Sequence, residues 1–233
     1  LLLGSTIGGT RAALTYYSET YASRVQMFNI GVSLLENDNK ISWRDYSSDS
    51  DGTWNEMTGK LLADMLGEGE SVQLGKTYPE VLTVENSGTI DEYVRVSIYK
   101  YWLNPQNEKV QDLSPELIGL NLVNLGDDWM MDEKASTRER TVLYYKNVLP
   151  VGAVTPPFSD TLTLDPAIGT RVRQEKTTDG KYTTVKTIFE YDGYSFQIEV
   201  EVDAVQTHNA ADAILSAWGC KVEVDENGSL SLQ

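Results

Sequence analysis

The chain has 233 residues, enough for one domain with a substantial core, and it carries 19 Lys and Arg against 35 Asp and Glu, a formal net charge of −16. Because affinity for a phosphate backbone comes from clustered basic residues, this balance argues against nucleic acid and anionic membrane surfaces as partners. No apolar run reaches the length of about 18 residues that a membrane-spanning helix needs, so we expect no membrane insertion of this chain. The single cysteine, Cys220, cannot form an internal disulfide and is expected to be a buried small hydrophobe.

The first ten residues form an apolar, glycine-containing segment at the start of an acidic chain. In extended form they span about 33 Å, and side-chain alternation places five positions on one face. These positions are Leu1, Leu3, Ser5, Ile7 and Gly9. The pattern is typical of a strand that is donated to a sheet, either in its own domain or in a neighbouring subunit.

The chain is therefore divided into an N-terminal donor strand or extension, residues 1–18, and a single β-sandwich domain, residues 19–233. The apolar start also resembles the end of the hydrophobic region of a secretory signal. We expect that any further targeting sequence lay upstream of Leu1 and was removed, which predicts a secreted protein at the cell surface.

Next along the chain, residues 25–34 alternate and predict a strand, and the aspartate-rich residues 44–52 predict a polar loop. Apolar residues at helical spacing predict a helix or helical turn over residues 55–67. Residues 71–74 and 81–85 then predict strands.

The aspartate-rich loop has oxygen-bearing side chains at alternate positions before a glycine, as in the first half of a calcium loop. Its candidate ligands are Asp49 and Asp51. The glutamate expected at the twelfth position, counted from Ser47, is Thr58. A solvated acidic loop is the alternative, and the sequence predicts no other metal site.

Residues 86–89, Asn-Ser-Gly-Thr, predict a turn before a strand at residues 93–102. Asn86 and Gly88 are the expected turn residues, because Asn and Gly tolerate the positive φ of tight turns.

In the second half of the chain, Ser114-Pro115-Glu116 predicts a helix start, and a proline-rich break follows at residues 149–157. Asp-Gly and Asn-Gly pairs predict hairpin turns at residues 179–180, 192–193 and 227–228. The remaining predicted elements are strands at residues 129–134, 141–148, 158–164, 171–178, 182–191 and 194–205, a helix at 209–218 and a hairpin at 221–232. Together these elements predict a mainly β fold, an antiparallel jelly-roll-like β-sandwich with a few short helices in crossover loops.

The residues that common catalytic mechanisms need are scarce. The one histidine, His208, lies at a predicted strand-to-helix junction and is expected to be structural. The sequence contains neither a zinc-binding His-Glu-x-x-His helix nor a Gly-x-Ser-x-Gly nucleophile elbow. It therefore predicts no enzyme and no cofactor.

Three blocks of sequence carry a resemblance to a known family. The first is Gly-Gly-Thr followed by the Tyr-Tyr-Ser-Glu of residues 16–19 and the Asn-Ile-Gly-Val of residues 29–32. The second runs from residues 67–72 to the strand, Asn-x-Gly turn and strand of residues 84–96, and the third joins residues 200–206 to Ala-Trp-Gly at 217–219. Together they resemble the TasA and camelysin family of secreted Gram-positive fibre and biofilm-matrix proteins.

The resemblance implies a jelly-roll sandwich exported by the general secretory route and assembled outside the cell into pilus-like fibres. In such fibres an N-terminal strand of one subunit completes the sheet of the next. The implied partners are identical subunits, with an accessory or anchoring subunit as a further possibility. This sequence departs from the family in retaining residues 1–10 ahead of the aromatic pair, which lengthens the available donor strand.

Two alternatives stay open. One is a monomeric cell-surface adhesin or binding module whose exposed aromatics, such as Trp43, Trp54 and Trp129, contact a ligand, although aromatics in a sandwich usually belong to the core. The other is a camelysin-like surface metalloprotease, against which the single histidine argues.

Overall fold

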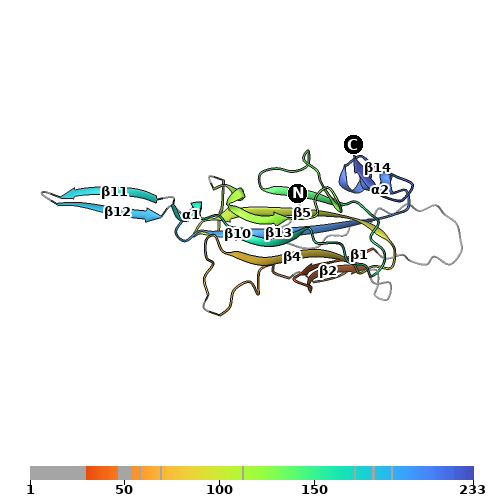
Figure 1. Ribbon diagram of the computed structural model, residues 1–233, viewed down its shortest axis with the longest axis horizontal. Coiled ribbons are helices and arrows are strands. Elements are labelled where there is room, and N and C mark those ends of the chain that lie inside the picture. The colour runs from red at the N-terminus through yellow and green to blue at the C-terminus, as the bar shows by residue number, and fades with distance from the viewer. Residues whose placement is uncertain are drawn as a thin grey trace.

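The computed structural model describes residues 30–46, 54–57, 59–68, 70–111, 113–170, 172–179, 182–189 and 191–233. The predicted donor segment and the calcium candidates Asp49 and Asp51 lie outside these residues. The structure is mainly β, with 46% of residues in strands and 9% in helices, which confirms the predicted fold class. Two antiparallel sheets form a β-sandwich, from one end of which a separate hairpin extends (Figure 1).

The first sheet has six strands in the order β3-β2-β1-β4-β10-β7. Their bounds are β1 (Gly31–Glu36), β2 (Asn39–Tyr46), β3 (Trp54–Met57), β4 (Thr77–Asn86), β7 (Ile118–Leu122) and β10 (Ser159–Leu164). Asn37 and Asp38 join β1 to β2 with φ angles of 49° and 66°. Positive φ at both central residues is the backbone of the tight hairpin turn whose twist matches paired strands, and Asn and Asp adopt it more readily than most residues.

The second sheet has the order β13-β5-β9-β8, with the short β6 also paired to β5. Its strands are β5 (Glu92–Leu103), β6 (Lys109–Val110), β8 (Trp129–Met131), β9 (Arg140–Tyr145) and β13 (Ser195–Gln206). β13 and β5 pair without interruption, from Ser195 opposite Leu103 to Gln206 opposite Glu92.

The core lies between the two sheets and is formed by the inward-facing residues of both. Val32 and Leu82 of the first sheet and Val96 and Val202 of the second are completely buried. Trp129 is also completely buried, and its indole N–H donates to the Pro156 carbonyl at 3.0 Å. Burying a large apolar side chain contributes about 1.5–3 kcal/mol, so this seam is the main source of stability.

A second, smaller core joins the C-terminal residues to the sandwich. It lies between the second sheet and a unit made of α2 (Ala210–Trp218), β14 (Val222–Val224) and β15 (Leu230–Leu232), hereafter the C-terminal unit. Ile214 of α2 is completely buried in this core with Tyr93 and Val205. Gly219 ends the helix with a φ of 68°, a conformation that glycine adopts without strain. The predicted helix and C-terminal hairpin are confirmed.

The connections hold the remaining elements. A 3-10 helix, η1 (Pro115–Leu117), begins where predicted, with the Ser114 hydroxyl accepting from the Glu116 N–H. A short helix, α1 (Ala167–Thr170), precedes the predicted hairpin of β11 (Val172–Asp179) and β12 (Tyr182–Phe189). No helix among the described residues is long and apolar enough to cross a membrane.

Three predictions between residues 44 and 74 were wrong. The helix expected at residues 55–67 is instead β3 followed by turns at 61–66, because Trp54–Met57 pairs with β2 and Leu62 has a left-handed backbone, φ 63°. Arg44–Tyr46 is part of β2, although a loop was expected from residue 44. Residues 71–74 are irregular, and the next strand begins at Thr77.

Asn86 and Gly88 form a turn, but for a different reason than predicted. Neither has a positive φ. Asn86 is completely buried, and its side chain donates to the carbonyls of Ile90 and Leu149 at 2.8 and 2.9 Å and accepts from the Gly88 N–H at 2.9 Å. The amide thus fixes the crossover from β4 in the first sheet to β5 in the second.

Asn86→Ala is expected to lower the free energy of unfolding by about 2–3 kcal/mol, because it removes three hydrogen bonds of a completely buried amide. Denaturant unfolding followed by tryptophan fluorescence measures the change. The matched control is Asn121→Ala, which removes one exposed hydrogen bond to Asp160 and is expected to cost less than about 0.5 kcal/mol. Equal losses in the two variants would contradict the role given to Asn86.

Candidate functional site

The longest of the described strands that end the two sheets is β13. This strand pairs with β5 on one side, and among the described residues no strand pairs with its other side. β13 has 12 residues, whereas the other strands that end the two sheets, β3, β7 and β8, have 4, 5 and 3. The outer edge of a strand at the end of a sheet is a template on which a further strand can pair.

A groove runs along this edge, between β13 and the first sheet. Its volume is about 340 Å³. Its floor and walls mix apolar and polar side chains: Leu34, Ile41, Ser42, Gly59, Lys60, Leu61, Gln197, Ile198, Glu199 and Val200. Residues 197–200 lie on β13, so a chain lying in the groove would run beside this strand.

Residues 59–61 line one side of the groove and are held there by close packing. A Cβ atom at Gly59 would lie 1.9 Å from the Ile41 carbonyl oxygen, so only glycine fits there. Three residues on, the Leu62 N–H donates to the Glu36 carboxylate at 2.6 Å. These contacts fix Lys60 and Leu61 at the groove.

Glu36 has a second carboxyl neighbour, Glu80 of β4. Both are buried, with exposed fractions of 7% and 1%. Burial, followed by the charge of Glu36 and a hydrogen bond to it, raises the pKa of Glu80 from 4.5 to about 8. At neutral pH Glu80 is therefore protonated and donates to Glu36, which in turn accepts from the wall of the groove.

On the outer face of the second sheet, acidic residues of β13 are tied to β5. The Tyr101 hydroxyl donates to Glu199 at 2.6 Å, and burial together with this bond raises the pKa of Tyr101 to about 12. Arg95 forms an ion pair with Asp203, with Nε 2.9 Å from Oδ2, and its guanidinium lies 5.3 Å from the centre of the Trp218 ring. These bonds hold the backbone of β13 in place beside the groove.

Residues with catalytic side chains are dispersed in the described part of the chain. His208 is exposed at the junction of β13 and α2, where the sequence placed it. Cys220 is only half-buried, contrary to expectation, because it follows the end of α2. Its thiol lies 3.9 Å from an Asp132 oxygen, and burial raises its pKa. The described residues contain no group of three or more His, Cys, Asp or Glu that could hold a metal ion.

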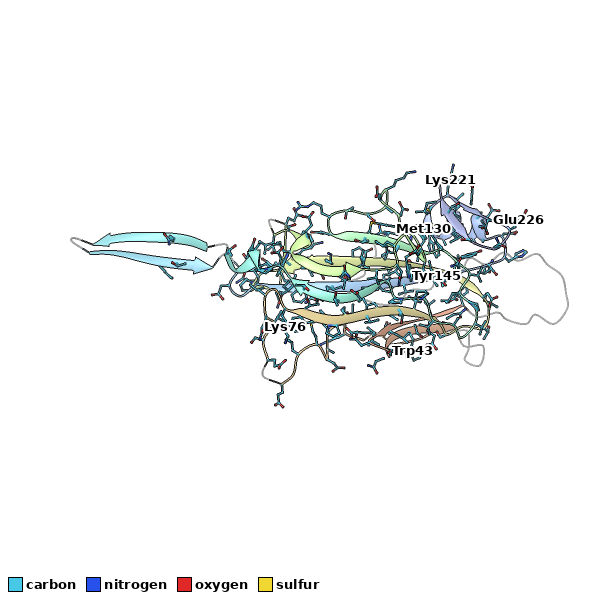
Figure 2. All side chains as sticks on the ribbon, in the orientation of Figure 1. Trp43, Lys76, Met130, Tyr145, Lys221 and Glu226 are labelled. Carbon is cyan, nitrogen blue, oxygen red and sulfur yellow. The ribbon has the colours of Figure 1, made fainter. Side chains whose placement is uncertain are left out.

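The three tryptophans that were considered as ligand contacts lie in different surroundings. Trp129 belongs to the core, and Trp43 is half-buried on β2 (Figure 2). The side chain of Trp54 lies outside the described part. A hollow of about 430 Å³ lies elsewhere, near the start of β13, and is lined by four aromatic side chains together with aliphatic and polar residues. Trp102 stacks there on Tyr191 with ring centres 6.3 Å apart, and Tyr194 and Phe196 also line it. Sequence patterns did not indicate this hollow, because its residues come from separate strands and connections.

The sequence predicted the N-terminal donor strand, but it did not predict that β13 would be the strand with which a donor could pair. Alternation identified residues 194–205 as a strand, but which strand lies at the end of a sheet depends on long-range pairing. The chain matches no protein-family model, no curated protein and no solved structure. The resemblance to fibre proteins therefore stays a prediction.

The Glu36–Glu80 pair predicts an unusual pH dependence of stability. The pKa of Glu80 is raised on folding, so between pH 4.5 and about 8 the folded state binds more protons than the unfolded state. The free energy of unfolding is then expected to fall as the pH rises through this range, and the contribution of the Glu80 proton is lost above pH 8.

Urea unfolding at pH 5, 7 and 9 measures this slope. Glu80→Gln keeps a donor at the position without an ionisable proton, and is expected to flatten the slope. The exposed Glu68→Gln serves as the control for removing one carboxylate. An unchanged slope in Glu80→Gln would show that the proton is not held at this residue.

Proposed function

We propose that this protein is the structural subunit of an extracellular filament, a pilus or biofilm-matrix fibre, in which the N-terminal segment of one copy pairs with β13 of the next. The observation that carries the proposal is the position of the 12-residue strand β13 at the end of its sheet, with a groove beside it. The chain also supplies a segment of matching character, an apolar stretch that alternates through Leu1, Leu3 and Ile7.

The energetics favour such pairing. Main-chain hydrogen bonds between an added strand and an edge strand give affinity, and the inward side chains of the added strand fill the groove and fix the register. Each buried leucine or isoleucine contributes about 2 kcal/mol. Donation from one copy to the next does not close on itself, so the product is a filament.

Deleting Leu1–Gly9 is expected to abolish filaments and to leave soluble monomers, because the groove of each copy then has no donor. Electron microscopy and sedimentation velocity measure assembly. A synthetic peptide of residues 1–18 added to the truncated protein is expected to bind and to raise its melting temperature, since it binds only the folded state. Its Ile7→Asp version is expected to fail, because it buries an unpaired carboxylate.

Filaments of normal length from the truncated protein would contradict the proposal. If the truncated protein forms no filaments but the added peptide does not bind to it, residues 1–9 are needed for assembly but do not lie in the groove. A full-length protein that stays monomeric and melts far above the truncated form would show that the strand inserts into its own domain.

The acceptor side is tested by Leu61→Glu, which puts a charge on the groove wall. Leu61 is half-buried and lies on a connection, so the sandwich is expected to fold while peptide affinity falls about tenfold or more. Leu125→Glu, at a residue 39% exposed outside the groove, is the matched control and is expected to bind normally. Fluorescence anisotropy of the labelled peptide measures both affinities, and equal affinities would place the donor outside this groove.

The aromatic hollow supports a second candidate, a surface binding module. Tyr191, Tyr194 and Phe196 offer ring faces there that suit an apolar or carbohydrate ligand. Tyr194→Ala and Phe196→Ala distinguish the two functions. Loss of surface adhesion with normal filaments would favour the module, and normal adhesion would remove it.

A further inference from the structure

The hairpin of β11 and β12 is the most isolated part of the described structure. Its eight-residue strands pair along their whole length, from Val172 opposite Phe189 to Asp179 opposite Tyr182. They form a sheet of their own and make extensive contacts only with each other. Figure 1 shows the hairpin extending along the long axis, away from one end of the sandwich.

A two-stranded ribbon is marginally stable alone in water, and among the described residues no third strand pairs with β11 or β12. Strands of eight residues extend about 27 Å. A partner surface that covers the ribbon would therefore stabilise it as well as bind it.

The charge of the hairpin indicates the partner. Residues 171–190 carry five Lys and Arg and three Asp and Glu, a net charge of +2. The whole chain carries −16, so the rest of it carries −18. A basic segment on a strongly acidic molecule is complementary to every other copy of the same molecule.

The C-terminal unit lies towards the opposite end of the long axis from the hairpin (Figure 1). Residues 207–233 carry four Asp and Glu and one Lys, a net charge of −3. Asp212, Glu223 and Glu226 are exposed, and Figure 2 shows Glu226 and Lys221 at the outer side of the unit. The unit also exposes Leu215 and Val224, at 42% and 36%, so it offers apolar as well as acidic contacts.

We propose that the β11–β12 hairpin of one copy docks on the C-terminal unit of a second copy. The contact rests on the proposed filament and adds to it an end-to-end junction that is independent of the donor strand. Because the two surfaces are different and lie towards opposite ends, each copy uses both, and the contact repeats along a row. Its electrostatic part weakens as salt is added.

The test exchanges the charges of the two surfaces in the full chain. The hairpin-reversed variant is Lys176→Glu with Lys186→Glu, and the unit-reversed variant is Glu223→Lys with Glu226→Lys. Each alone faces like charges across the junction and is expected to associate about tenfold more weakly in sedimentation velocity at low salt. An equimolar mixture restores opposite charges at every junction and is expected to regain the parent's association.

Lys76→Glu with Arg138→Glu is the matched control for the hairpin-reversed variant. It changes the net charge equally at exposed positions that belong to neither the hairpin nor the C-terminal unit, and is expected to associate as the parent does. In a Cys220→Ser background, Lys186→Cys mixed with Glu226→Cys is expected to give dimers with a short bismaleimide, whereas Lys76→Cys mixed with Glu226→Cys does not.

Parent-like association of both reversed variants, or no recovery in their mixture, would overturn the junction. The junction would also be overturned if the hairpin-reversed variant bound an anionic polysaccharide more weakly but associated with itself as the parent does. The hairpin would then be a binding site for a polyanion. The Ile7→Asp variant tests the donor-strand proposal separately from the hairpin junction. If that variant loses filaments but keeps the charge-dependent association, both proposals stand. If that variant still forms filaments and mixing the two charge-reversed variants still restores association, only the donor-strand proposal is contradicted.

Discussion

The pairing of β13 with β5 is the constraint on which the rest of the structure depends. Its 12 residue pairs align Val200 and Val202 with Ile98 and Val96, and so present one continuous apolar face to the first sheet. A one-residue slip would turn this face outward, so the core and the register specify each other. The same pairing places β13 at the end of its sheet, where it is the longest of the described strands in such a position.

Around this pair, polar side chains fix two irregular segments and add a cross-strand link to the pair itself. Asn86 holds the crossover between the sheets, Arg95 and Asp203 link β5 to β13, and Glu36 holds Leu62 at the groove wall. Such groups are expensive to bury alone, and each is satisfied by a specific partner. The groove thus has a rigid shape before any strand enters it, which favours binding because little order has to be gained.

The two proposed contacts differ in physical character. Strand addition at β13 depends on main-chain hydrogen bonds and burial, which salt affects little, whereas docking of the hairpin depends on opposite charges that salt screens. An acidic chain of net charge −16 repels its copies at a distance. A basic hairpin at one end reduces that repulsion in one direction only, which favours growth in a line over clustering.

The sequence by itself determined the fold class, the strands with clear alternation, the Asp-Gly hairpin, the C-terminal helix and the scarcity of catalytic residues, because these depend on local periodicity and turn chemistry. It failed at residues 55–67, where Leu61, Leu62 and Met65 have helical spacing but pack on the core from successive turns after β3. It predicted Asn86 as a turn residue, but not that the side-chain amide holds the turn by hydrogen bonds. Only the tertiary structure decided that β13 ends a sheet, that a groove lies beside it, and that Glu36 and Glu80 meet, because strand order and pairs 44 residues apart are set by the packing of the whole sandwich.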